Sequence, residues 1–115
     1  MKLPNIFDKP GSTKTYPAGA TIFAEGDPPE FMYVVKTGHV DIVKDGRVVE
    51  TVGPDGFFGE LALVDKSSRS ATAKAKTDCE LAPISEKQFL FMASETPFFS
   101  LTVMREMANR LRRAP

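Results

Sequence analysis

The amino-acid sequence predicts a mainly β domain that ends in helices. Between Lys14 and Ile84, short runs of β-favouring residues alternate with turn signals at close spacing, which is typical of a compact antiparallel barrel or sandwich. From Ser85 onward, helix start signals precede apolar residues three and four positions apart, which is the period of a helix. With 115 residues, the chain has room for one domain around a single core.

Residues 1–13 contain two prolines and a glycine without clear periodicity, so we expect a loose lead-in before the β region at 14–84. The runs predicted as strands are Thr21–Ala24, Met32–Lys36, Val40–Lys44, Val48–Val52, Ser70–Lys76 and Cys79–Ile84. The pair Asp45-Gly46 predicts a tight hairpin, because both residues tolerate positive φ. Pro83 lacks a backbone N–H, so its strand ends there or lies at a sheet edge.

Two helices are expected in the remaining segment, 85–115. Ser85 and Gln88 match an S-x-x-Q capping box, which opens a helix through about Ser94. Thr96-Pro97 then supply an N-cap and a first-turn proline for a second helix.

The second helix carries an apolar stripe and a basic cluster. The stripe consists of Leu101, Met104, Ala108 and Leu111. It suits packing of the helix on its own barrel as well as a dimer interface, and fewer than three heptads do not distinguish the two. The basic cluster consists of Arg105, Arg110, Arg112 and Arg113. Because cations favour a helix C-terminus, we interpret it as a solvated face rather than a nucleic-acid surface.

The composition argues against nucleic-acid and membrane roles. Fifteen basic and fifteen acidic residues give a formal net charge of zero, which leaves no overall electrostatic attraction to nucleic acid. The single Cys79 forms no internal disulfide, which suits a reducing compartment, and no apolar run is as long as a membrane span or a signal-peptide core. We therefore expect a soluble cytoplasmic protein without direct DNA or membrane binding.

Catalysis and metal binding are also disfavoured. One cysteine and one histidine, His39, are too few for a haem, iron–sulfur or cupin-type metal centre. His39 follows Gly38 at a turn into a strand, where a surface or strand-end role is expected. No second histidine is present for a triad, and no close carboxylate pair is placed for acid–base work. The expected activity is binding, without a cofactor.

The strongest functional signal lies between residues 57 and 73. Gly59 allows close backbone approach to a ligand, and the apolar run Leu61–Val64 suits a short helix whose free N–H groups face an anion. Arg69 supplies a permanent positive charge with donors matched to phosphate oxygens. Glu60, in the first turn of that helix, is an acceptor for a ribose hydroxyl. Each charged residue alone is explained by a surface or helix-start role, but together with Gly59 and the small residues around Ser70 they predict a ligand site.

Small residues follow this arginine in alternation. Ser70, Thr72, Lys74 and Lys76 fall on one face of the strand, and three alanines fall on the other. The alanines either fill a tight core position or leave room for a ligand.

The string FFGELALVDKSSRSATA, residues 57–73, resembles the phosphate-binding cassette of cyclic-nucleotide-binding domains of the catabolite activator and protein kinase A regulatory subunit type. Glu60 and Arg69 are nine positions apart, a spacing found in that family. Residues 16–43 (YPAGATIFAEGDPPEFMYVVKTGHVDIV) are similar to the family's first strands. The resemblance implies a double-stranded β-helix, or jelly-roll, as the fold.

The resemblance also implies a ligand and its contacts. The ligand would be cAMP, with cGMP also possible, and the whole domain would be a sensor whose C-terminal helices transmit occupancy. The phosphate and ribose contacts implied are the Ser70 hydroxyl, the Ala71 amide and the backbone of Gly59, Leu61 and Ala62. Val35 and Val40 are implied as apolar base contacts, whereas Val52, Phe57 and Phe58 are assigned to the core.

Two departures from the family pattern bear on DNA binding and on recognition of the base. DNA-binding members continue past the long helix into a helix-turn-helix domain, whereas this chain stops at Pro115, so no direct DNA binding is expected. Some members use a still longer helix to reach the base across a dimer, and nothing beyond Arg113 is present for that contact. A homodimer through the second helix and an unidentified protein partner remain possible. The alternative function is a structural or oligomerisation module on the same fold that has lost ligand binding.

Overall fold

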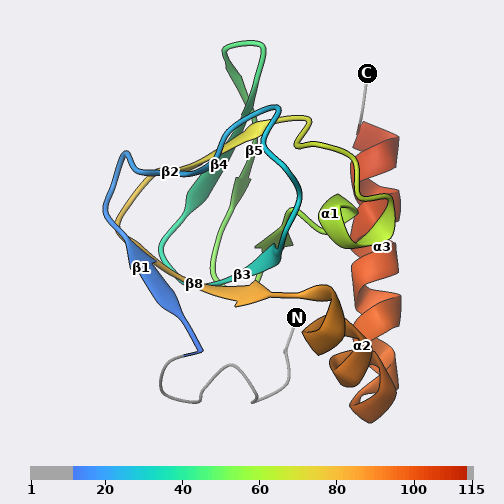
Figure 1. Ribbon diagram of the computed structural model, residues 1–115. Coiled ribbons are helices and arrows are strands. Elements are labelled where there is room, and N and C mark those ends of the chain that lie inside the picture. Colours follow the sequence, from blue (N-terminus) through green and yellow to red (C-terminus); the bar gives the residue numbers. More distant parts are fainter. Residues whose placement is uncertain (1–11, 114–115) are drawn as a thin grey trace. The chain divides into compact units, whose positions relative to one another are not determined.

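The computed structural model describes residues 12–113 and divides into two compact units, the first ending at Ser85 and the second beginning at Glu86. Figure 1 shows strands in the first unit and two successive helices in the second. Most of the predicted lead-in, residues 1–11, lies outside the described residues.

The first unit holds two antiparallel sheets. The strands are β1 Lys14–Tyr16, β2 Thr21–Phe23, β3 Met32–Thr37, β4 Val40–Lys44, β5 Arg47–Val52, β6 Phe57–Phe58, β7 Thr72–Ala75 and β8 Cys79–Ile84. Within residues 12–113, one sheet has the order β1-β8-β3-β6 and the other β2-β7-β4-β5. The predicted class, a mainly β jelly-roll followed by helices, is confirmed.

The core of this unit lies on the inner faces of both sheets. Its buried members are Tyr33, Val35, Val40, Val52, Phe58, Ala73, Ala75, Cys79 and Leu81. Phe57 is buried as well, so the assignment of Val52, Phe57 and Phe58 to the core is confirmed. The alternation predicted for β7 also holds, because Ala73 and Ala75 are buried whereas Lys74 and Lys76 are exposed.

Some strand boundaries differ from the predictions. β1 and β6, with three and two residues, were not among the predicted runs, although the equally short β2 was. β7 begins at Thr72 rather than Ser70. β8 continues through Pro83 to Ile84, so the prediction that it ends at the proline is wrong.

The other prediction for Pro83, a place at a sheet edge, fits locally. There β8 pairs with Tyr33 of β3 on one side, whereas its pairing with β1 covers only Cys79 to Leu81. In the described part of the chain, the other side of Pro83 therefore has no strand partner, which is where a proline is tolerated.

The predicted hairpin joins β4 to β5. Asp45 and Gly46 have φ values of 53° and 77°, the left-handed pair that matches the twist of a two-residue hairpin. Its tip extends away from the rest of the β-rich unit (Figure 1). His39 lies just before β4, where its backbone N–H donates to Thr77 Oγ1 and its carbonyl accepts from Lys76, in agreement with a strand-end role.

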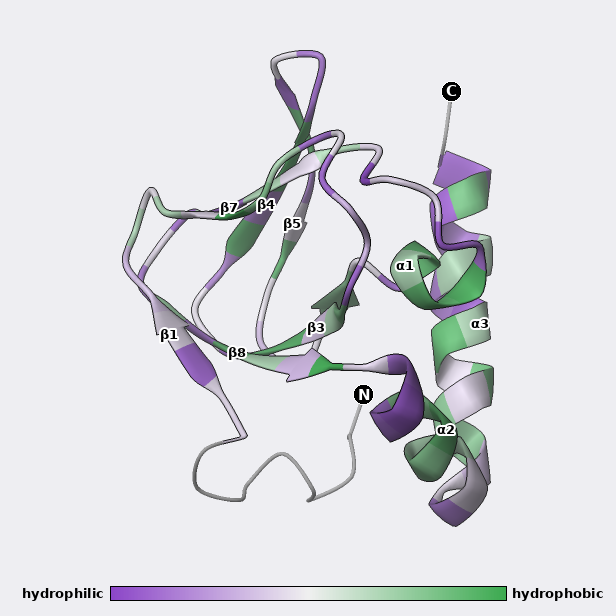
Figure 2. Ribbon diagram, in the orientation of Figure 1, coloured by the Kyte–Doolittle hydropathy of each residue, from purple (hydrophilic) through white to green (hydrophobic). Residues whose placement is uncertain are grey.

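The second unit consists of α2, Glu86–Glu95, and α3, Pro97–Arg113. Pro97 begins α3 as predicted, and the rings of Phe89 and Phe99 meet edge to face at 5.1 Å between centroids. Figure 2 shows hydrophobic and hydrophilic residues interspersed along both helices. None of the described helices is long and apolar enough to cross a bilayer.

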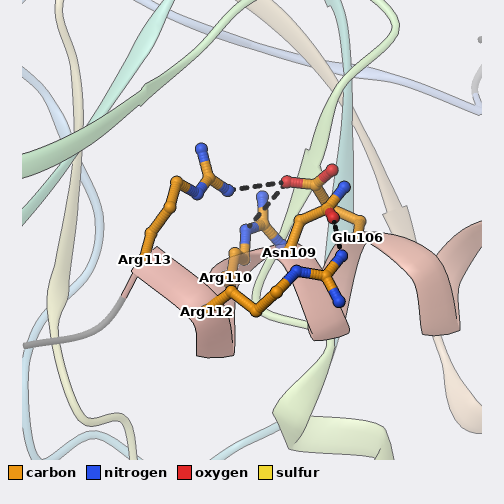
Figure 3. A network of polar contacts seen from close by, with 5 residues as sticks. All are labelled: Glu106, Asn109, Arg110, Arg112 and Arg113. Carbon is orange, nitrogen blue, oxygen red and sulfur yellow. Dashed lines mark hydrogen bonds and ion pairs between the residues drawn. The ribbon is translucent and has the colours of Figure 1, made fainter.

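The apolar stripe predicted on α3 is not its buried face. Phe99 and Val103 are buried, whereas Met104 is 57% exposed and Leu111 is 77% exposed. Of the basic cluster, Arg110 and Arg113 lie 3.5 Å and 3.1 Å from the carboxylate of Glu106, and Arg112 donates to Asn109 (Figure 3). The cluster thus contacts its own helix, as expected for a solvated face.

Candidate functional site

The predicted site begins where β6 ends. Gly59 has φ 76°, a left-handed conformation that glycine adopts without strain. Glu60 follows in helical conformation at the N-cap of α1, Leu61–Val64. The short helix is confirmed, but Glu60 precedes its first turn rather than lying within it, and its side chain makes no capping hydrogen bond.

The first amides of α1 are partly used within the segment. Ala62 donates to the Gly59 carbonyl at 3.2 Å, and Leu63 donates to the Glu60 carbonyl at 3.0 Å. The expectation that the helix presents free N–H groups to an anion is therefore wrong for these two amides. The positive charge of the site comes chiefly from a side chain instead.

A tight turn leads from α1 to that side chain. The Asp65 carboxylate accepts from the backbone N–H of Ser67 at 3.0 Å and from its hydroxyl at 2.7 Å. These two hydrogen bonds favour the ionised form and lower the pKa of Asp65. Lys66, between them, has φ 55°, so the chain reverses here and directs Arg69 back towards Gly59.

The Arg69 side chain is buried, with 8% of its surface exposed. Nη1 donates to the Gly59 carbonyl at 3.2 Å and Nη2 to the Phe31 carbonyl at 2.6 Å. The Phe23 ring lies against the guanidinium, with its centroid 3.9 Å from Cζ. Two backbone carbonyls and one aromatic ring therefore fix the orientation of this cation.

The backbone of Arg69 is fixed by the loop that joins β2 to β3. Its N–H donates to Asp27 at 2.9 Å, and its carbonyl accepts from Gly26 at 2.8 Å. Because Phe31 at the end of the same loop accepts from the side chain, one loop holds both parts of the residue.

Gly59 is required by this arrangement. A Cβ at this position would lie 2.9 Å from Arg69 Nη1 and 3.4 Å from Phe23 Cε2. The sequence analysis expected Gly59 to allow close backbone approach to a ligand, and this stays a prediction; what lies close to Gly59 in the structure is the Arg69 side chain.

One nitrogen of the buried guanidinium has no hydrogen-bond acceptor among the described residues. Among residues 12–113, Arg69 Nε has no hydrogen-bond partner although it is buried. A buried donor without an acceptor is costly in free energy. Burial lowers the pKa of Arg69, and nearby Tyr33, Asp27, Glu30 and Glu60 act in the opposite direction. Burial also raises the pKa of Tyr33.

The second charged site residue, Glu60, is 6% exposed. The buried polar or charged residues recorded between Ser12 and Arg113 are Glu60 and Arg69. Burying a carboxylate and a guanidinium is unfavourable unless other groups satisfy them. The charge of Glu60 also acts to raise the pKa of Arg69, so the two residues on which the sequence argument rested interact electrostatically.

The remaining predicted residues are placed differently. The Leu61 side chain and Ser70 are exposed, Ala62 is buried and Ala71 is half-buried. Val35 and Val40 are completely buried within the core cluster. Their role as base contacts stays a prediction.

Sequence reasoning missed Phe23 and Phe31. Both lie in the region that resembled the family's first strands, and Phe23 was assigned only to a strand. The contact of Arg69 with the Phe31 carbonyl joins residues 38 positions apart. No local pattern in the sequence signals a contact over that separation.

Comparison with known proteins gives a family. The family model described as cyclic nucleotide-binding domain matches residues 13–96. Over 76 residues, the chain is 42% identical to the cAMP-dependent protein kinase regulatory subunit of Aspergillus niger, covering 64% of this chain and 18% of that protein. Over 106 residues it is 32% identical to the cyclic AMP receptor protein of Thermus thermophilus, covering 88% of this chain and 49% of that protein.

Comparison with solved structures points to the same family. The catabolite activator protein of Thermus thermophilus superposes with a TM-score of 0.80 at 32% identity, covering 87% of this chain and 49% of that one. A cAMP-bound structure named PfPKA-R superposes with a TM-score of 0.77 at 28% identity, covering 88% and 35%. The chain thus spans about half or less of these proteins. It belongs to the cyclic-nucleotide-binding domain family.

Proposed function

We propose that this domain binds cAMP, and cGMP less tightly, as a sensor or regulatory module. The observation that carries the proposal is the buried Arg69 guanidinium, whose Nε lacks an acceptor among the described residues. A cyclic nucleotide supplies one anionic phosphodiester, which is the acceptor that this donor lacks. Relatives named after cAMP support the first choice of ligand, and an EAL enzyme solved in a cGMP-bound form supports the second.

The two buried charged residues would each bind a different part of the ligand. The phosphate would accept from Arg69 in a charge-assisted hydrogen bond, which is stronger than a neutral one. The Glu60 carboxylate would accept from the ribose 2′-hydroxyl. The Ser70 hydroxyl, the Ala71 amide and the backbone of Gly59, Leu61 and Ala62 would complete the phosphate and ribose contacts. Val35 and Val40 would line the base.

The proposed role is binding without catalysis, cofactor or metal. Two relatives matched over most of this chain are named as a receptor protein and a transcriptional regulator, and the EAL enzyme shares 28% of its length with this chain. Between Ser12 and Arg113, no three metal-binding side chains are grouped. A cytoplasmic location and the absence of direct DNA contact within this domain are part of the same proposal.

The helical unit would transmit whether the ligand is bound. Ligand binding would order the segment from Gly59 to Ser70 and shift the equilibrium position of α3.

Deletion of residues 104–115 is then expected to weaken binding while the β-rich unit still folds. Hydrogen exchange in α3 should slow when cAMP is added. Equal protection with and without saturating ligand would contradict transmission, though not binding.

The α3 stripe would serve a homodimer. Its exposed members, Leu101, Met104 and Leu111, leave an apolar strip of the kind that a second amphipathic helix covers. Sedimentation at increasing protein concentration tests this part of the proposal. A monomer at every concentration would contradict it.

Isothermal titration calorimetry with cAMP and with cGMP tests the ligand. We expect heat and a raised melting temperature with both, and a lower dissociation constant for cAMP. Arg69→Ala is the control, since it removes the proposed phosphate donor. A folded protein that gives no heat and no thermal shift with either nucleotide would favour a structural or oligomerisation module.

A further inference from the structure

An aromatic ring outside the cassette lies directly against the proposed phosphate-binding arginine. Cζ of Arg69 is 3.9 Å from the centre of the Phe23 ring, well within cation–π distance. Such a contact stabilises the cation most when water is excluded, and Arg69 is buried. Phe23 belongs to β2, far in sequence from the segment at residues 57–73.

A bulge in β2 explains why this ring points inward. Thr21 pairs with Lys74 and Phe23 pairs with Ala73, so the register shifts between them. In a regular strand, Ile22 and Phe23 would point to opposite faces of the sheet. Here both pack against the core cluster. Bulges beside functional sites re-aim side chains in this way.

The ring itself is held on its other sides by aromatic neighbours. Its centroid lies 5.9 Å from that of Phe58 and 6.1 Å from that of Tyr33. Tyr33 and Phe58 stack on one another at 5.3 Å. Phe23 therefore has little freedom to turn away from the guanidinium.

We propose that Phe23 is a positioning residue of the site, which holds the Arg69 guanidinium in the orientation that leaves Nε–H for the anion. The two carbonyls of Gly59 and Phe31 bind the Nη atoms, and the ring supports the face of the group. Without the ring, the guanidinium would be free to tilt about the line that joins its two hydrogen bonds to these carbonyls. The expected effect on ligand affinity rests on the proposed function, whereas the effect on Arg69 itself does not.

The first experiment uses the full chain without ligand. The side-chain Nε–Hε resonance of Arg69 is assigned by its loss in Arg69→Lys. A ring current from Phe23 should displace this resonance, and Phe23→Leu should move it back towards the usual arginine position. Phe31→Leu is the matched control, because it removes a ring from the same aromatic cluster and keeps the backbone carbonyl. An Arg69 resonance unmoved by Phe23→Leu, or moved equally by Phe31→Leu, would overturn the proposal.

The second experiment measures cAMP affinity. Phe23→Leu should weaken binding about two- to thirty-fold, whereas Phe23→Tyr, which keeps the ring face, should bind nearly as the unmutated protein does. Incorporation of trifluorophenylalanine at position 23 weakens the ring quadrupole with little change in shape, so it tests the contact even if Phe23→Leu fails to fold. Its affinity should lie between those of the unmutated protein and Phe23→Leu.

Coupling to Arg69 distinguishes positioning from general packing. In an Arg69→Ala background, Phe23→Leu should cause little further loss of affinity. Full additivity would show that Phe23 acts independently of Arg69 and would overturn the proposal. If the unmutated protein binds no cAMP, the proposed function fails, and the ligand-free resonance still decides whether the Phe23 ring contacts the Arg69 guanidinium in solution.

Discussion

The β-rich unit and the helical unit differ in which side chains they leave in an unfavourable environment. In the first, the charged residues Glu60 and Arg69 are buried. The second exposes more large apolar residues than the first: it exposes Leu90, Phe91, Phe98, Leu101, Met104 and Leu111, whereas the first exposes Val48, Val49, Leu61 and Val64. Each arrangement costs free energy in the isolated chain.

Under the proposed function, the two units would bind two kinds of partner. A buried charge with an unpaired donor is satisfied by a small polar ligand that enters the unit. An exposed apolar strip on a helix would be covered by another apolar surface. Such a surface belongs to a macromolecule rather than to a small ligand. Ligand affinity should therefore depend on the first set of residues, and stability and association on the second.

The largest expected effect separates the two faces of α3. Phe99 is 3% exposed and contacts Phe89. Phe99→Ala should therefore lower the free energy of unfolding by about 3 to 5 kcal/mol. The matched control, Leu111→Ala, should change it by less than about 0.5 kcal/mol at low protein concentration. Urea denaturation measures both. A comparable loss at both positions that grows with protein concentration would show that a second copy buries Leu111.

The next effect tests the charge in the β-rich unit. Removing one partner of a desolvated, hydrogen-bonded charge pair costs about 2 to 5 kcal/mol, so Arg69→Ala should weaken cAMP binding about thirty-fold to several thousand-fold. Arg69→Lys should restore only part of the affinity, because an ammonium keeps the charge without the planar fork. Calorimetry on protein shown to be folded by circular dichroism gives the comparison. Normal binding by folded Arg69→Ala would refute this assignment of the site.

A smaller effect is expected at Glu60. A hydrogen bond to a charged group contributes about 1.5 to 3 kcal/mol, so Glu60→Ala should weaken binding about ten- to a hundred-and-fifty-fold. The 2′-deoxy analogue of cAMP should bind the unmutated protein more weakly, yet lose little further affinity to Glu60→Ala. If the two losses add fully in this cycle, Glu60 does not bind the ribose hydroxyl.

The sequence predicted most of the longer elements, and it also predicted the short β2 and α1 from their residue types and flanking signals. The runs that became β3, β4 and β8 have five or six residues and were found, whereas the two-residue β6 was not. On α3, the predicted stripe is largely exposed, whereas Phe99 and Val103 are buried. Apolar residues lie on two faces of that helix, and a period alone does not say which face is covered.

In the site, the sequence identified the charged residues but not what holds them. Arg69 and Glu60 follow from a local motif, since the motif fixes their types and spacing. Phe23, the Phe31 carbonyl and the Asp27 carbonyl reach Arg69 only because two distant segments meet in the folded sheets. The place of Glu60 before α1 rather than in its first turn depends on the backbone of Gly59, which the motif does not specify.

The smallest effect concerns the choice of nucleotide and lies at the edge of the site. Ser70 is exposed, next to the buried Arg69, and its hydroxyl is able to bond a phosphate oxygen or a guanine amino group. If it serves the phosphate, Ser70→Ala should weaken cAMP and cGMP equally, by about ten-fold or less, because water screens a charge-assisted hydrogen bond at this exposed position. Parallel titrations of both nucleotides measure the two losses. A loss confined to cGMP would assign the hydroxyl to guanine, and tighter binding of cGMP by the unmutated protein would reverse the proposed preference.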